Sequence, residues 1–155
     1  MPLLTTGCTV AVGAVTGVGV DSLGRPVGYL RVCEDRIDGA TLYRSEGGER
    51  VRGSWSVAMP VATFAKWSLA EPASNWTADP PLERLRAGVD YTLYGWTSDN
   101  SSSAGEITFT VSELARLEPG QVLYWAGDMS KDGNRSFNVV VSEEDFKHDA
   151  CALVE

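Results

Sequence analysis

The chain has few of the residues that build metal and catalytic centres. Its 155 residues include three cysteines and a single histidine, His148. No Cys-x-x-Cys pair, histidine cluster, nucleophile elbow or phosphate-binding glycine loop occurs in it. His148 lies in the acidic stretch 143–149, whose spacing supplies neither the nucleophile nor the orienting carboxylate that a catalytic histidine needs. We therefore predict a non-catalytic protein without a cofactor, in which residues 143–149 form a solvated polar segment.

Basic charge and long apolar runs are also scarce. Thirteen Lys and Arg residues, spread along the chain, stand against 21 Asp and Glu residues, which gives a net charge of −8 and a pI near 4.6. Phosphate binding requires clustered basic side chains, so we expect no nucleic-acid partner. The longest apolar stretch, residues 10–20, is interrupted by glycine and threonine and is too short to span a bilayer.

Period-two alternation predicts an all-β protein. In residues 10–20 the β-branched Val10, Val12, Val18 and Val20 occupy even positions and glycines occupy odd ones, which predicts a strand with one packed face and one bare face. Turn residues at 21–26, Gly-Gly at 47–48 and Asp-Gly at 132–133 separate further segments of this kind. The predicted strands are 10–20, 27–34, 40–45, 49–59, 61–69, 90–98, 106–111, 121–126 and 136–141, with 71–81 as a loop and 99–105 as a hairpin tip. Residues 10–155 are long enough to form one domain with its own core.

One segment carries a resemblance to a known fold. Leu85-Arg86-Ala87-Gly88-Val89-Asp90-Tyr91 precedes a predicted strand and resembles the tyrosine corner of fibronectin type III and related immunoglobulin-like sandwiches, with Leu85, Gly88 and Tyr91 at the matching positions. The resemblance implies an immunoglobulin-like antiparallel sandwich in which the Tyr91 ring is buried and its hydroxyl bonds to backbone a few residues upstream. The chain exceeds a sandwich of roughly 100 residues, so extra N- and C-terminal hairpins are expected. The similar segment 114–124 has one residue more before Tyr124, so Tyr124 is not expected to form a corner bond.

The first nine residues resemble a lipoprotein export signal. Leu3-Leu4-Thr5-Thr6-Gly7-Cys8 is similar to the tail of a bacterial signal in which the cysteine is acylated, although the basic region and most of the apolar region of such a signal are missing. The abundance of Ala, Gly, Val and Arg resembles small secreted or lipid-anchored proteins of high-GC Gram-positive (actinobacterial) bacteria. These resemblances imply an extracytoplasmic protein that contacts the membrane only through a lipid on Cys8. The alternative is that residues 1–9 are a disordered start with a free thiol.

The other two cysteines form an even pair. If Cys8 is the lipid site, Cys33 and Cys151 remain, and a disulfide between them would accord with export. The alternative is two buried free thiols in a cytosolic protein.

Three aromatic side chains are candidates for ligand binding. If Tyr91 faces the core, alternation turns Tyr94 and Trp96 outward, and Trp76 lies in the proline-rich segment 71–81. Exposed aromatic rings stack on sugars or peptides, whereas the alternative is that additional strands cover them. These residues favour a non-catalytic binding or structural module whose partner is another protein or a cell-envelope glycan. A carbohydrate-binding module or accessory domain of a hydrolase is the alternative function.

A partial calcium motif completes the set of candidates. Asp128, Ser130 and Asp132 match the first half of a calcium-binding loop, with Gly133 at the turn. The twelfth position holds Val139 in place of the bidentate glutamate. We therefore predict a hairpin turn at Asp132-Gly133 without a metal.

Overall fold

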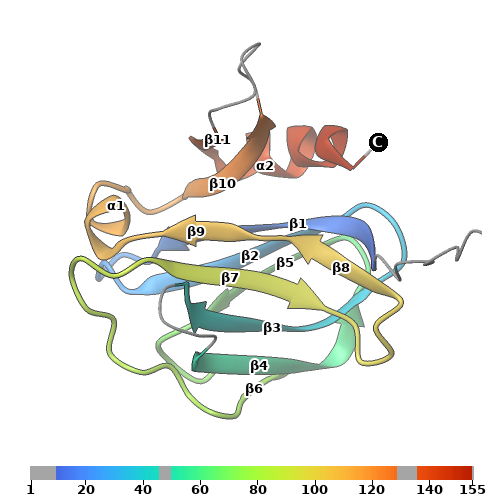
Figure 1. Cartoon of the computed structure of the whole chain (residues 1–155), viewed down its shortest axis with the longest axis horizontal. Helices are drawn as coiled ribbons and strands as arrows, with labels where there is room; N and C mark the ends of the chain where they lie inside the picture. Colours follow the sequence, from blue (N-terminus) through green and yellow to red (C-terminus); the bar gives the residue numbers. More distant parts are fainter. Residues whose placement is uncertain (1–9, 46–49, 129–135, 155) are drawn as a thin grey trace, which may run out of the picture.

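The computed structural model describes residues 10–45, 50–128 and 136–154 (Figure 1). These residues are mostly β-strand, which confirms the predicted all-β class. Eleven strands join in one nearly closed sheet, in the order β11-β10-β1-β8-β7-β3-β4-β6, with β2 and then β5 on the other edge of β1 and with β9 beside β7.

In the first half of the chain the strand bounds are close to those expected from the sequence, whereas the helical segments of the second half were not predicted. The strands are β1 (Ala11–Val20), β2 (Pro26–Val32), β3 (Ile37–Arg44), β4 (Arg50–Val61), β5 (Phe64–Ser68), β6 (Trp76–Ala78), β7 (Tyr91–Trp96), β8 (Ser102–Gly105), β9 (Ile107–Phe109), β10 (Gln121–Asp128) and β11 (Ser136–Ser142). The helical segments are α1 (Val111–Ala115), α2 (Glu143–Asp149) and the 3₁₀ turn η1 (Ala150–Leu153). None of the helices in the described ranges is long and apolar enough to cross a bilayer.

Strand β1 is the junction of the sheet. Its residues 14–20 pair antiparallel with β2 along one edge. On the other edge, its N-terminal half pairs parallel with β8, and Gly17 and Val18 pair antiparallel with β10. Both terminal hairpins, β1–β2 and β10–β11, are therefore hydrogen-bonded to each other through β1.

Two apolar clusters lie on opposite faces of β1. Ala14, Val18 and Val20 belong to the larger core, and the glycine face packs against a second cluster. A Cβ on Gly17 would lie 2.5 Å from Val122 Cγ1. The expectation of a bare glycine face is therefore wrong: side chains of neighbouring elements fill the space that the glycines leave. The second cluster consists of Val15, Val27, Tyr29, Val122, Tyr124, Phe146 and Ala150.

The acidic stretch 143–149 forms helix α2, whose charged side chains are mostly exposed as predicted, whereas the burial of its Phe146 was not predicted. The Ser142 hydroxyl accepts a hydrogen bond from the Asp145 N–H at 3.1 Å and caps the helix. Phe146 is fully buried, with its ring edge-on to Tyr29 and Tyr124 at centroid distances of 6.1 and 5.2 Å. One apolar anchor among acidic residues thus holds the helix on the sheet.

Two predicted connections contain strands. The segment 71–81 includes β6, which pairs with β4, and its Trp76 ring stacks on Trp67 of β5 at 4.2 Å. The predicted hairpin tip 99–105 includes β8, whose edge pairs with β1. Ser102 is buried there, and the Thr97 hydroxyl satisfies its backbone: it accepts from the Ser102 N–H and donates to the Ser102 carbonyl.

The corner segment has the geometry that the resemblance implies for Tyr91. This side chain is 3% exposed, and its hydroxyl accepts a hydrogen bond from the backbone N–H of Arg86 at 2.8 Å. Gly88 has a φ of +77°, a conformation that glycine adopts without strain. Tyr124, in contrast, packs against Phe146 in the second cluster.

We expect Tyr91→Phe to lower the free energy of unfolding by about 1–2 kcal/mol, because the Arg86 N–H loses its acceptor in a partly buried place. Tyr124→Phe, the matched control, should cost less. Urea denaturation of both variants measures the two losses. Equal stability of the wild type and Tyr91→Phe, or a larger loss at Tyr124, would contradict the corner assignment.

Candidate binding groove

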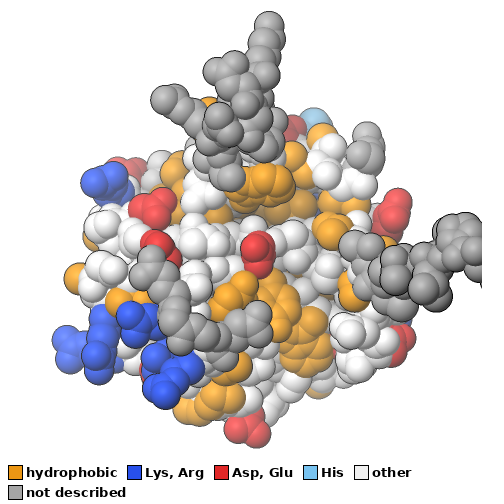
Figure 2. Space-filling view, viewed as in Figure 1, with side chains coloured by type: hydrophobic (Ala, Val, Ile, Leu, Met, Phe, Trp, Pro, Cys, Tyr) orange, Lys and Arg blue, Asp and Glu red, His pale blue; other side chains and the backbone are white. Residues whose placement is uncertain are grey.

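An open groove of about 950 Å³ lies on the face where β7, β8 and β9 meet the β10–β11 hairpin. It is lined by Tyr94 of β7 and Trp125 of β10, and also by residues 103–105 of β8, by Glu106 and by Thr108 of β9. Figure 2 looks onto this face, where apolar side chains gather on either side of a central acidic side chain. The hollow thus combines aromatic and polar side chains from strands far apart in sequence.

The pairing of β1 explains why this groove exists. Strand β8 pairs with the N-terminal half of one edge of β1, and β10 pairs with Gly17 and Val18 farther along the same edge. The two strands therefore lie next to each other along β1, and the groove lies where they meet. The side-chain amide of Asn138 on β11 donates a hydrogen bond to the backbone carbonyl of Thr108 on β9 at 2.8 Å. This bond fixes the β10–β11 hairpin against β9 across the groove.

The apolar lining is unusually well exposed for one small area. Val12 is 50% exposed and Trp125 is 39% exposed, and both contribute to the groove. The half-buried Tyr94 ring is held edge-on by Tyr43, with the centroids 5.7 Å apart. Single exposed apolar residues are common on proteins, whereas here two of them line one hollow together with the Tyr94 ring.

Polar groups stand beside these rings. The exposed Glu106 carboxylate accepts a hydrogen bond from the Tyr43 hydroxyl at 3.1 Å, which orients it next to Tyr94. The Glu113 carboxylate accepts from the Thr110 N–H in the capping box of α1, so its position is fixed by the helix. A hollow with aromatic faces and a few oriented polar groups has the composition of a small-ligand or oligomer-binding site.

Of the three aromatic residues predicted to bind a ligand, the structure brings Tyr94 to the groove. Trp96 is half-buried, and its indole N–H donates to the Thr41 hydroxyl at 2.9 Å. Trp76 is half-buried in the stack on Trp67. Both side chains thus contribute to packing between strands.

Sequence reasoning missed Trp125 and Glu106 as groove residues. Trp125 follows the buried Tyr124, so the alternation that was applied to Tyr94 would also have turned Trp125 outward. Glu106 had no such signal, because its position depends on β8 and β9 lying along one edge of β7.

No family model, curated protein or solved structure matches the chain. Functional conclusions therefore depend on the chemistry of the described residues.

The remaining predicted site residues lie elsewhere or outside the described part of the chain. Cys8, Ser130 and Asp132 fall outside it, and Asp128 ends β10 beside the segment that is not described. In the described ranges, no group of three or more His, Cys, Asp and Glu side chains is placed to hold a metal ion.

His148 is exposed on α2, and a hydrogen bond to the adjacent carboxylate of Asp149 raises its pKa.

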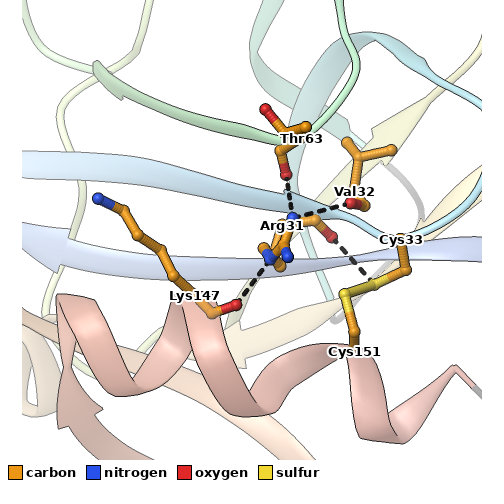
Figure 3. The surroundings of a disulfide bond; sticks show 6 residues. All are labelled: Arg31, Val32, Cys33, Thr63, Lys147 and Cys151. Carbon is orange, nitrogen blue, oxygen red and sulfur yellow. Dashed lines mark hydrogen bonds between the residues drawn. A yellow bond between two sulfur atoms is a disulfide. The ribbon is translucent and has the colours of Figure 1, made fainter.

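Cys33 and Cys151 form a disulfide, the pairing that the cysteine count predicts (Figure 3). It joins the end of β2 to η1, with the Cα atoms 5.6 Å apart. Beside it, the Arg31 guanidinium donates to the carbonyl of Lys147 at 2.7 Å and to that of Thr63 at 3.0 Å. Because the last carbonyls of a helix lack partners within it, Arg31 satisfies one of them at the end of α2.

We expect Trp125→Ala to change the free energy of unfolding by no more than about 0.5 kcal/mol, because this side chain is partly exposed and lines an open groove. Trp96→Ala, which removes the same side chain, should cost at least about 2 kcal/mol because it loses packing and the bond to Thr41. Urea denaturation compares them. A larger loss at Trp125 would assign that residue to packing and weaken the site.

The disulfide gives a direct measurement. Thiol titration of the denatured, unreduced protein should find at most one free thiol, that of Cys8 if it carries no lipid. The Cys33→Ser/Cys151→Ser variant should be less stable by about 2–5 kcal/mol because the bridge closes a long loop. Three free thiols in the unreduced protein would contradict the bridge.

Proposed function

We propose that the protein is a non-catalytic, extracytoplasmic binding module whose groove holds a glycan chain. The observation that carries this proposal is the placement of Tyr94 and Trp125 in one open hollow with Glu106 and Asn138. Aromatic rings pack against the apolar faces of sugar rings, and carboxylate and amide groups bond to sugar hydroxyls.

The shape of the hollow favours a chain over a compact ligand. Its volume of about 950 Å³ is at the upper end of the range for small-ligand sites, and it is open to solvent. A segment of a longer glycan can occupy such a groove while its ends continue outside. A cell-envelope glycan meets this requirement.

The proposed location outside the cytoplasm is supported by the disulfide. Bridges of this kind persist in oxidising compartments and are rare in the cytosol of most organisms. Together with the resemblance of residues 3–8 to a lipoprotein signal, the bridge favours a secreted protein or one anchored by a lipid on Cys8. Such a protein has the cell envelope within reach.

We also propose that the sheet is a variant of the immunoglobulin-like, fibronectin type III-like sandwich. The hydrogen bond between the Tyr91 hydroxyl and the Arg86 N–H and the positive φ of Gly88 support this assignment. In such folds function resides in grafted sites, so the groove and not the sandwich carries the proposed activity.

Glycan-array binding followed by calorimetry tests the proposal. The wild type should bind one glycan class saturably, and Tyr94→Ala and Trp125→Ala should each weaken that binding by about tenfold, the equivalent of 1.4 kcal/mol for a lost ring contact. Trp125→Phe, which keeps an aromatic face, should retain most of the affinity.

Leu23→Ala provides the control, since Leu23 is 73% exposed in the β1–β2 turn and lines none of the hollows described here. Its affinity should equal that of the wild type. Absence of saturable binding to any glycan would instead favour a structural spacer. Binding that survives both Tyr94→Ala and Trp125→Ala would place the ligand away from the groove.

A further inference from the structure

Basic residues that are spread along the sequence gather at one end of the β3–β4 hairpin. A hollow of about 840 Å³ there is lined by five arginines, half of the ten in the chain. Figure 2 shows basic side chains gathered at the lower left of the molecule, at this end of the sheet. We call this hollow the arginine pocket: Arg44, Arg50, Arg52, Arg84 and Arg86. Clustering of this kind was not expected from the sequence, and it occurs in a protein whose net charge is −8.

The strand register brings three of the arginines together. Arg44 of β3 and Arg50 of β4 are direct partners in the ladder. The register shifts between Leu42 and Tyr43, so Arg52 is an extra residue on β4, as in a β-bulge. Arg50 and Arg52 both line the hollow at this end of the ladder.

The other two arginines come from the segment that leads into the tyrosine corner. The Glu83 N–H donates to the carbonyl of Arg52 at 2.8 Å, and the Arg86 N–H donates to the Tyr91 hydroxyl at 2.8 Å. The backbone around Arg84 is therefore tied to β4 on one side and to β7 on the other. These bonds fix the backbone of the pocket before any ligand enters, which lowers the ordering cost of binding.

Positive charge predominates among the described residues that line the pocket. Glu83 is the single carboxylate of this described set and pairs with Arg52 at 2.6 Å, so its five guanidinium groups and one carboxylate give a formal charge of +4. Within residues 10–45, 50–128 and 136–154, the side chains of Arg44, Arg50, Arg84 and Arg86 form no hydrogen bond or ion pair. Like charges that line one hollow repel one another, and a bound anion would relieve that repulsion.

We propose that the arginine pocket binds a small, multiply charged oxyanion, such as a compound with several phosphate or carboxylate groups. Guanidinium groups form paired hydrogen bonds with both kinds of group. The arginine pocket shares no lining residue with the groove that is proposed to hold a glycan, so this site is independent of the proposed function. Its volume of about 840 Å³ leaves room for a molecule of this kind.

Calorimetry of the full chain with tripolyphosphate at low ionic strength tests the proposal. We expect one site per chain with a Kd below about 1 mM, weakening as salt is added. Arg84→Gln should lower the affinity by at least about tenfold through loss of charge-assisted hydrogen bonds, and Arg84→Lys should fall between this variant and the wild type because it keeps the charge but not the fork.

Arg116→Gln is the matched control, because it removes the same charge from an exposed arginine outside the pocket and should change affinity by less than about twofold. Citrate as a second probe separates carboxylate from phosphate recognition, and binding of either probe with the expected Arg84 dependence supports the site. Residues 46–49, which include Glu46 and Glu49, lie outside the described part of the chain, so the affinity measured for the wild type decides whether the pocket binds an anion. Binding of neither probe, or equal losses at Arg84 and Arg116, would overturn the proposal.

Discussion

Strand β1 is hydrogen-bonded along both edges and packed on both faces. It pairs with β2 on one side and with β8 and β10 on the other. Val18 is fully buried in the larger core, while Gly19 on the opposite face leaves room for the Tyr29 ring. A larger residue at Gly17 or Gly19 would force the second cluster away from the strand, since a Cβ at either would lie 2.5 Å from an atom of the 121–122 segment.

The groove follows from this arrangement. Because β8 and β10 share one edge of β1, Tyr94 and Trp125 are brought to one hollow although 30 residues separate them in the chain. The disulfide and the Arg31–Lys147 hydrogen bond fasten α2 and η1 to the sheet behind the β10–β11 hairpin. On the far side, β5 pairs with β2 and β6 with β4, and the Trp67–Trp76 stack joins the two edges.

Local patterns predicted the features that depend on neighbouring residues. Alternation and turn residues located most strands, and the spacing of Leu85, Gly88 and Tyr91 anticipated the hydrogen bond of the corner. Non-local pairing was not predictable in this way. The glycines of β1 indicated a bare face because the Phe146 ring that covers it comes from more than 120 residues later in the chain.

The same limit applies to the two hollows. The Gly47-Gly48 signal already suggested that Arg44 and Arg50 lie on opposite strands of a hairpin. Nothing local indicated that Arg84 would join them, because its position depends on backbone bonds to β4 and to Tyr91. Likewise Glu106 reaches Tyr94 only through the pairing of β8 and β9 with β7.

Native-state hydrogen exchange, followed by NMR, tests the central place of β1 most directly. The hydrogen-bonded amides of residues 14–19 should be among the slowest in the protein and should exchange only through global unfolding, because opening them disrupts β2, β8 and β10 together. Amides of the edge strands β6 and β11 should exchange faster through local opening. Exchange of β1 as rapid as that of β11 would contradict the account, since the two sides of the groove would then not be held together through this strand.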